Sequence, residues 1–301
     1  MDSIPSKRRK YDIKIVSSPK PIHFSGKSSP QNWSLPKSII DYITDYPSNS
    51  EVYQNMIKCC KYFFAKNPIL VFSNLYYNLG EWTTERAGKN LELNNISCKF
   101  WITKVFEVFT YMSDINDKTA STVISRIYQC NVTDLLLNNQ MISADELKII
   151  SSKVEYLHFY GVNVMDHDGS VFALEKLFKL FPKIKNFKFD LFSPHSITSE
   201  TFKELLKIEQ FFTLDSLRLR GVPETFDIES FYIYMKKNQR TYIFLEFNNI
   251  FSEDYKIRLE EIVKEIVEEE ELNCNYNRPF IYFDELDVQL KFEMQMLHHE
   301  F

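Results

Sequence analysis

Glycine is scarce in this chain, with 6 among 301 residues. Phosphate-cradling loops, dinucleotide-binding turns and many tight hairpins depend on glycine, so the sequence argues against these kinds of site. No apolar run reaches the roughly 20 residues that a membrane span needs, and the first residues form no apolar secretory segment. We therefore expect a soluble protein of the cytoplasm, the nucleus or both, without a membrane partner.

A disulfide framework is also absent. The cysteines number five, an odd count, and none stand in C-x-x-C spacing. This pattern indicates reduced thiols inside the cell, with Cys59 and Cys60 as packing residues of a helix. The net charge of −5 gives no general attraction to nucleic acid, so a nucleic-acid partner is not expected even though Lys7–Lys10 is basic.

Hydrophobic residues make up 44% of the chain, which is enough to bury a substantial core. Composition and breaks along the chain divide it into four parts. These are a disordered basic tail at 1–32, a helical unit at 33–68, a linking segment at 69–130 with one or two strands and a helix, and a repeat domain at 131–301.

Three short helices are predicted between Leu35 and Pro68. Ser34 and Ser50 are placed to cap two of them, and Pro36 falls in a first turn, where its missing N–H costs nothing. Their apolar residues at helical spacing include Ile39, Ile40, Ile43, Val52 and Cys60. So small a unit cannot bury all of this surface alone, so part of it must face the rest of the chain or another protein.

A second pattern begins near Val132 and repeats every 22, 30, 30 and 28 residues. Its five segments are Val132-x-x-Leu135-x-Leu137, Val154-x-x-Leu157-x-Phe159, Ile184-x-x-Phe187-x-Phe189, Leu214-x-x-Leu217-x-Leu219 and Tyr242-x-x-Leu245-x-Phe247. Each predicts a strand with one buried face, and a capped amphipathic helix follows each strand. The near-constant spacing favours a solenoid of parallel strands backed by helices, with an ordinary α/β sheet as the alternative.

Both halves resemble known families. The residues around Leu35-Pro36, Glu51-Val52 and Cys60-Lys61 resemble an F-box, and the strand–helix units resemble irregular leucine-rich repeats. From about Leu35 to the end, the chain is similar to the large F-box-like families of nematodes. The resemblance implies an α/β fold, in which a three-helix F-box-like unit precedes a leucine-rich-repeat-like solenoid. The family's asparagine position holds Gln140, Val162 or Val222, so no asparagine ladder is expected.

This resemblance implies a non-catalytic substrate receptor of SCF-type ubiquitin ligases, without a cofactor or metal. Its F-box-like unit would bind a Skp-family adaptor, and through it the cullin, while the repeats would hold an unknown target protein. By carry-over, the adaptor-facing residues would be Leu35, Pro36, Ile39, Ile40, Ile43, Val52 and Cys60. The alternative is a protein-interaction scaffold without a ligase connection, which sequesters or neutralises a partner.

The target would meet the strand residues that lie between the buried positions. These form two predicted rows, Leu136, His158, Lys188, Arg218 and Glu246, then Asn138, Tyr160, Asp190, Arg220 and Asn248. We expect His158, Tyr160, Lys188, Arg218, Arg220 and Glu246 to contact the target, whereas any single one of them could simply be a solvated strand residue. The cluster Met165–Ser170 groups two aspartates with a histidine, but its sequence is typical of a turn before a helix rather than of a metal site.

Overall fold

The structure is a computed structural model that describes residues 31–86, 88–111, 117–190, 196–248, 252–269 and 275–297. The predicted basic tail lies outside the described residues except for its last two positions, and Cys274 lies outside them too. No helix in these ranges is both long enough and apolar enough to cross a bilayer.

Helices and strands alternate along most of the chain. The helices are α1 (Lys37–Asp45), α2 (Ser50–Cys59), α3 (Lys61–Lys66), α4 (Thr119–Ile124), α5 (Ala144–Ile150), α6 (Leu174–Lys179), α7 (Thr201–Leu205), α8 (Ile228–Met235), α9 (Glu253–Glu268) and α10 (Val288–Leu297). The strands are β1 (Ile69–Asn78), β2 (Glu81–Thr83), β3 (Lys99–Phe109), β4 (Ile127–Cys130), β5 (Asp134–Asn138), β6 (Met141–Ser143), β7 (Tyr156–Tyr160), β8 (Asn163–Met165), β9 (Asn186–Asp190), β10 (Ser216–Val222), β11 (Tyr242–Phe247) and β12 (Phe280–Tyr282). Short 3₁₀ helices lie at Leu93–Asn95 and Glu209–Thr213.

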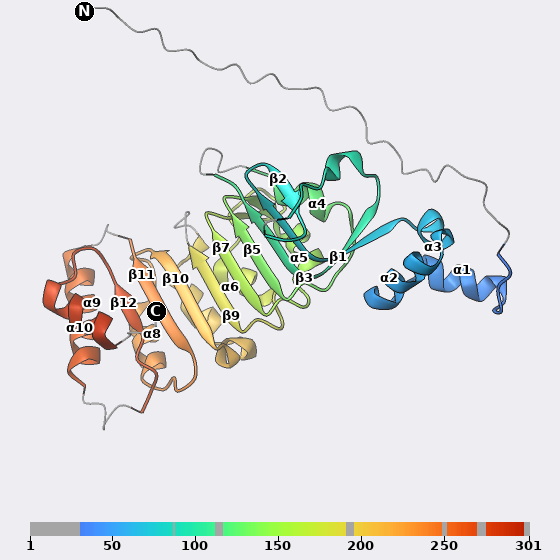
Figure 1. Cartoon of the computed structure of the whole chain (residues 1–301). Helices are drawn as coiled ribbons and strands as arrows, with labels where there is room; N and C mark the ends of the chain where they lie inside the picture. The colour runs from blue at the N-terminus through green and yellow to red at the C-terminus, as the bar shows by residue number, and fades with distance from the viewer. Residues whose placement is uncertain are drawn as a thin grey trace, which may run out of the picture.

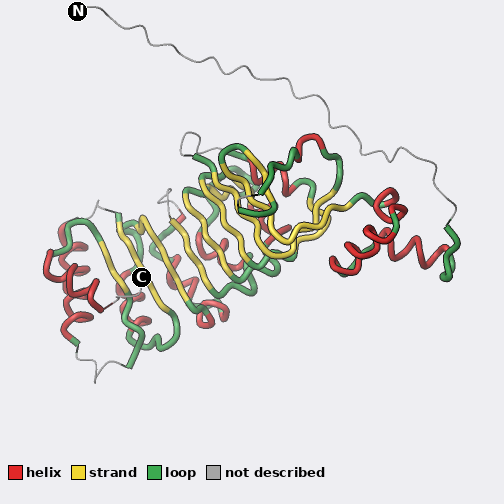
Figure 2. Tube along the Cα trace, in the orientation of Figure 1, coloured by secondary structure: helices red, strands yellow, loops and turns green. Residues whose placement is uncertain are grey.

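One long sheet runs through the molecule in the order β12-β11-β10-β9-β7-β5-β3-β1-β2, and β4 also pairs with β3. Neighbouring strands are parallel except for β1 and β2, which form an antiparallel hairpin. Figure 1 shows the strands side by side along the length of the molecule, with α5, α6 and α8 on one face of the sheet. Figure 2 shows the same alternation of strands and helices. The predicted mixed α/β fold with a mostly parallel sheet is confirmed.

The sheet does not begin at the predicted boundary near residue 131. β1 and β3 come from the segment predicted to link two domains, yet they pair in parallel and β3 continues the ladder to β5. One hydrophobic core extends from Leu75 to Met294 across that boundary. The segment 69–130 is therefore the start of the sheet domain rather than a linker.

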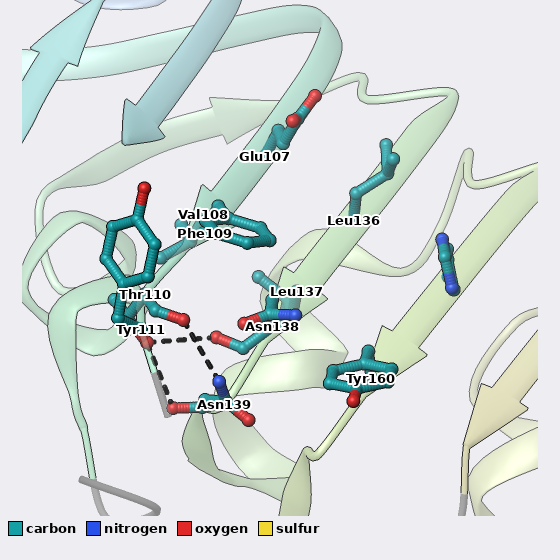
Figure 3. Close-up of a pocket in the computed structure, with 11 residues that line it drawn as sticks. Glu107, Val108, Phe109, Thr110, Tyr111, Leu136, Leu137, Asn138, Asn139 and Tyr160 are labelled. Carbon is teal, nitrogen blue, oxygen red and sulfur yellow. Dashed lines mark hydrogen bonds between the residues drawn. The ribbon is translucent and has the colours of Figure 1, made fainter. Parts of the chain in front are cut away.

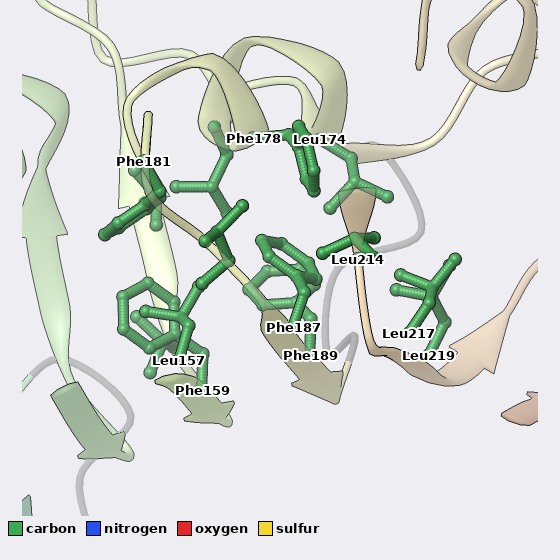
Figure 4. Close-up of a cluster of buried hydrophobic side chains, with 14 of the residues drawn as sticks. Leu157, Phe159, Leu174, Phe178, Phe181, Phe187, Phe189, Leu214, Leu217 and Leu219 are labelled. Carbon is green, nitrogen blue, oxygen red and sulfur yellow. The ribbon is translucent and has the colours of Figure 1, made fainter. Parts of the chain in front are cut away.

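The buried positions of the first four predicted strands are confirmed. Leu135, Leu157, Phe187 and Leu217 occupy one register row and are all buried. Figure 4 shows Phe178 of α6 beside the side chains of neighbouring strands, where its ring centroid lies 5.4 Å from that of Phe187. Such stacked apolar layers let each unit bury its face against the next.

The fifth unit differs from its prediction by two residues. Leu245 and Phe247 are buried as predicted, but Leu245 pairs with Leu219 rather than with Leu217, whose partner is Ile243. Tyr242, predicted as the first buried residue, is 56% exposed. Because Ile243, Leu245 and Phe247 are all apolar, their alternation is the same in either register, and only pairing with β10 determines it.

Three of the predicted helix caps are confirmed. Ser143 and Glu146 form a complete capping box before α5, and Asp227 and Ser252 cap α8 and α9 through their side chains. Two helices start later than predicted, since α6 begins only at Leu174 and α7 only at Thr201. Before α6, the chain first forms a bridge between Met165 and Val171, which occupies the residues predicted as its first turn.

The first three helices form a small unit at one end of the sheet (Figure 1). Pro36 rather than Ser34 occupies the N-cap of α1, and Asn49 rather than Ser50 caps α2, accepting hydrogen bonds from two backbone amides. Asn67, at the end of α3, connects this helix to α1, because its side-chain amide donates to the carbonyl of Thr44 at 2.9 Å. Cys60 was predicted to lie inside a helix. In the structure it has an extended backbone conformation at the break between α2 and α3.

This unit packs on the sheet through a second, separate cluster. Tyr53 of α2 is fully buried with Ile69 and Trp101, at the start of β1 and in β3. The side chain of Gln54 donates to the carbonyl of Val71 at 3.2 Å. The contact uses the inner side of α2, so the outer sides of α1 and α2 remain available to solvent.

Candidate functional site

The outward side chains of the sheet form a continuous surface, which we call the strand face. Strand pairing aligns them in rows across the molecule. One row is Glu107, Leu136, His158, Lys188, Arg218 and Phe244, and the next is Phe109, Asn138, Tyr160, Asp190, Arg220 and Glu246. Of the six residues predicted for target binding, five lie in the predicted one of the two rows. In the structure both rows run from β3 to β11.

Glu246 lies one row away from its predicted place. It pairs across the ladder with Arg220, whereas Phe244 stands opposite Arg218. The reason is the two-residue shift of the fifth unit. Asn248, predicted for the second row, instead donates from its side chain to the carbonyl of Gly221 at 3.0 Å and helps to hold the turn after β10.

Arg220 has its charge balanced within the strand face. Its guanidinium lies 3.6 Å from the carboxylate of Asp190 and 3.1 Å from that of Glu246. Burial raises the pKa of Asp190, whose side chain is only 8% exposed, and the nearby Arg220 opposes that rise. The three side chains form a structural ion-pair group.

Lys188 and Arg218 differ from Arg220. They stand directly opposite each other on β9 and β10, and neither forms an ion pair with another residue of the described ranges. Arg218 stacks on the ring of Phe244 at 4.1 Å, and Lys188 lies 5.4 Å from the ring centre of Tyr156. Burial, followed by the positive charges of Lys188, Arg218 and Arg220, lowers the pKa of His158. We call His158, Lys188 and Arg218 the basic row.

A pocket of about 520 Å³ opens on the strand face where β3, β5 and β7 end. Figure 3 shows Phe109 and Tyr111 on one side of it and Tyr160 on the other, with Leu136 and Asn138 between them. The rings of Phe109 and Tyr111 meet edge to face at 5.6 Å, and both residues are exposed. His158 also lines this space, so the pocket adjoins the basic row.

The turn after β5 fixes one wall of the pocket. Asn139 takes a positive φ of 51° and is buried, and its side-chain amide donates to the carbonyl of Thr110 at 3.0 Å. Gln140, fully buried, donates to the hydroxyl of Thr110 and accepts from the backbone amide of Ala120 at 2.9 Å. At the equivalent positions of later units, Gly161 and Gly221 take the same left-handed conformation.

The residues predicted to face an adaptor divide between two sides of the helical unit. Leu35, Ile39 and Val52 are 45–55% exposed, Pro36 is exposed, and Ile43 and Cys60 are half-buried. Ile40 is the exception, because it is 4% exposed and packs inside the unit with Thr44. For Ile40 the structure therefore contradicts a surface role.

Two further apolar residues join the exposed side of α1. Tyr42 and Tyr46 are 65% and 68% exposed, and their rings lie 5.6 Å apart. Ile39 and Tyr42 are three residues apart within α1, which places them on one helix face, while Leu35 lies just before the helix and Tyr46 is its C-cap residue. We call Leu35, Ile39, Tyr42 and Tyr46 the α1 stripe.

Sequence reasoning did not assign Tyr42, Phe109 or Tyr111 to a site. The spacing of Tyr42 from Ile39 indicates a shared helix face, but the neighbouring Ile40 and Ile43 fit a helical spacing equally well. Phe109 and Tyr111 lie at the end of β3, in a segment for which the strand and helix assignments were left open.

The residues that the structure describes form no candidate metal site. They contain no group of three or more His, Cys, Asp or Glu side chains that could hold a metal ion. In the loop Met165–Ser170, Asp168 accepts from the backbone amide of Ser170 at 2.9 Å, and Gly169 takes a φ of 80°. These are the contacts of an ordinary turn.

Comparison of the chain with protein-family models, with curated proteins and with solved structures finds no match.

Proposed function

We propose that this chain is the substrate-recognition subunit of an SCF-type E3 ubiquitin ligase. Its three-helix unit would act as an F-box and bind a Skp-family adaptor, which connects to a cullin. Its strand–helix units would act as a leucine-rich-repeat-like solenoid whose strand face holds a target protein. The chain would contribute proximity, since holding target lysines beside the conjugating enzyme raises their effective concentration and promotes ubiquitination and degradation.

The α1 stripe is the observation that carries this proposal. Four large apolar side chains are exposed within α1 or directly at its ends, on a unit that packs against the sheet through Tyr53 of α2. Exposed apolar side chains at helical spacing are typical of protein interfaces. The helical unit also lies beyond the end of the sheet (Figure 1), so an adaptor on it would leave the strand face open for a target.

The experiment is a pulldown of the purified full chain with a recombinant Skp-family adaptor. We expect the wild-type chain to bind and the double variant Leu35→Ser, Ile39→Ser to lose binding. The matched control is Val288→Ser, Phe292→Ser, because these residues are also apolar and exposed but lie on α10 at the other end of the molecule. The control should bind as the wild type does.

Failure of the folded wild-type chain to bind any Skp-family adaptor would contradict the ligase assignment. Binding that survives in the stripe variant but not in the α10 control would place the adaptor elsewhere. A chain that holds a target without an adaptor would instead be the scaffold that the sequence left as the alternative.

A further inference from the structure

We propose that the strand face binds an extended, acidic segment of a partner protein, with one large apolar side chain in the pocket at the ends of β3, β5 and β7 and a carboxylate on Lys188 and Arg218. This inference rests on the proposed function in taking the strand face as the target-binding surface. It adds the chemistry of the segment that would be recognised.

The first argument is the unbalanced charge of the basic row. Like charges directly opposite each other on neighbouring strands destabilise a sheet, and Lys188 and Arg218 stand in this relation. Arg220, one row away, forms ion pairs with two carboxylates, whereas Lys188 and Arg218 form none among the described residues, and Asp190 and Glu246 act on Arg218 only from a longer distance. A carboxylate from a partner would relieve the repulsion and gain two charge-assisted hydrogen bonds.

The side chains of the basic row are also held in place. Stacking of Arg218 on Phe244 fixes the plane of the guanidinium and leaves its N–H edge for an anion. Burial lowers the pKa of Arg218, and the charge of Arg220 adds to this effect. A partly desolvated, orientated guanidinium binds a carboxylate with less loss of entropy and hydration than a free surface arginine does.

The pocket supplies the second, independent argument. Its volume of about 520 Å³ lies within the range of ligand-binding clefts, and Phe109, Tyr111 and Leu136 give it apolar walls. The side-chain oxygen of Asn138 lies in this region, buried and without a hydrogen-bond donor.

The distance between the two features suits a peptide. Asn138 is on β5, and Lys188 and Arg218 lie two and three strands away, on β9 and β10. Neighbouring strands are about 4.8 Å apart, so the separation is roughly 10–14 Å. An extended chain covers this in about three or four residues. The expected motif is therefore a large apolar residue with two or three residues between it and an Asp or Glu.

A polyanion fits the same surface less well. Glu107 lines the pocket, and Asp190 and Glu246 lie beside the basic row. These carboxylates would repel the regularly spaced phosphates of a nucleic acid, and the net charge of −5 adds to the repulsion. A segment with one or two acidic side chains next to an apolar one matches the arrangement.

The test is selection of random 12-residue peptides displayed on phage against the purified full chain. We expect enriched peptides to carry Phe, Tyr, Trp or Leu three or four positions from Asp or Glu. A synthetic copy of the most enriched peptide is then measured by fluorescence anisotropy. It should bind at least tenfold more weakly to the double variant Lys188→Gln, Arg218→Gln and to the single variant Tyr111→Ser. Lys207→Gln, which changes an exposed lysine of the helix side, should bind as the wild type does.

Enrichment of basic peptides, of apolar peptides without acid, or of none would overturn the inference, as would equal binding to the wild-type chain and the double variant. Each variant is first checked for unchanged thermal unfolding. The same preparations are tested for adaptor binding. Peptide recognition can therefore fail while adaptor binding holds, which would reject only this inference, and the reverse result would reject only the ligase assignment.

Discussion

Lys188 and Arg218 face each other across β9 and β10 with like charge, while the next pair in the ladder, Asp190 and Arg220, has opposite charge. One row thus brings two like charges together, and the adjacent row pairs opposite charges. The Asp190 row stabilises the fold, and the Lys188 row is available to a partner.

This contrast predicts opposite effects of two similar substitutions. Lys188→Gln should leave the free energy of unfolding unchanged or raise it by up to about 0.5 kcal/mol, because it removes a repulsion at a partly exposed site. Arg220→Gln should lower it by about 1–3 kcal/mol, because it leaves the buried carboxylate of Asp190 without its cation. Urea denaturation at neutral pH checks both. Equal losses in the two variants would contradict the division of roles.

His158 should titrate below its ordinary range. Burial and the cations of the strand face lower its folded-state pKa, so the unfolded chain binds more protons as the pH falls below about 6.5. The stability from neutral His158 is complete above the unfolded pKa and is lost as the pH falls toward the folded one. NMR titration of the imidazole should give a low pKa in the wild type and a higher one in Lys188→Gln. An unchanged pKa would exclude the influence of Lys188.

Asn139 combines a left-handed backbone with a buried hydrogen bond. Asn139→Gly keeps the backbone conformation and should cost about 1–2 kcal/mol through loss of the bond to Thr110. Asn139→Val loses the bond and also strains the backbone, so it should cost about 3 kcal/mol or more. Thermal unfolding compares the two. A valine variant as stable as the glycine variant would contradict the importance of the positive φ.

Neighbouring isoleucines of α1 should behave differently. Ile40→Ala removes buried methyl groups and should cost about 2–4 kcal/mol in the helical unit. Ile39→Ala, at an exposed position, should change the stability by less than about 0.5 kcal/mol. Hydrogen exchange of peptides from α1 to α3 reports on this unit directly. Equal loss of protection in both variants would show that α1 has no distinct outer side.

Much of the sheet could be predicted from sequence because its inward positions are apolar at a fixed spacing. Leu135, Leu157, Phe187 and Leu217 were assigned correctly on that basis. In the fifth unit Leu245 and Phe247 are buried as predicted, but the register against β10 differs by two residues, which the alternating apolar pattern alone does not determine. β1 and β3 were not recognised as part of the sheet because their spacing differs from that of the later units.

The candidate sites were harder to predict than the fold. Ile39 and Ile40 are the same residue type, and only packing against Thr44 and α3 distinguishes them. The pocket depends on where β3 ends relative to β5, which is a long-range register that the sequence does not encode locally. The outward positions of His158, Lys188 and Arg218 were predicted correctly, since these residues fall between inward positions of well-spaced units.

The most direct test of the account is hydrogen exchange, measured by mass spectrometry, of the full chain with and without a saturating Skp-family adaptor. The account predicts added protection in α1 and α2, centred on the α1 stripe, and no change in β5, β7, β9 and β10. Protection on the strand face, or no adaptor binding by the folded chain, would contradict the claim that the adaptor binds one end of the molecule and the target binds the sheet.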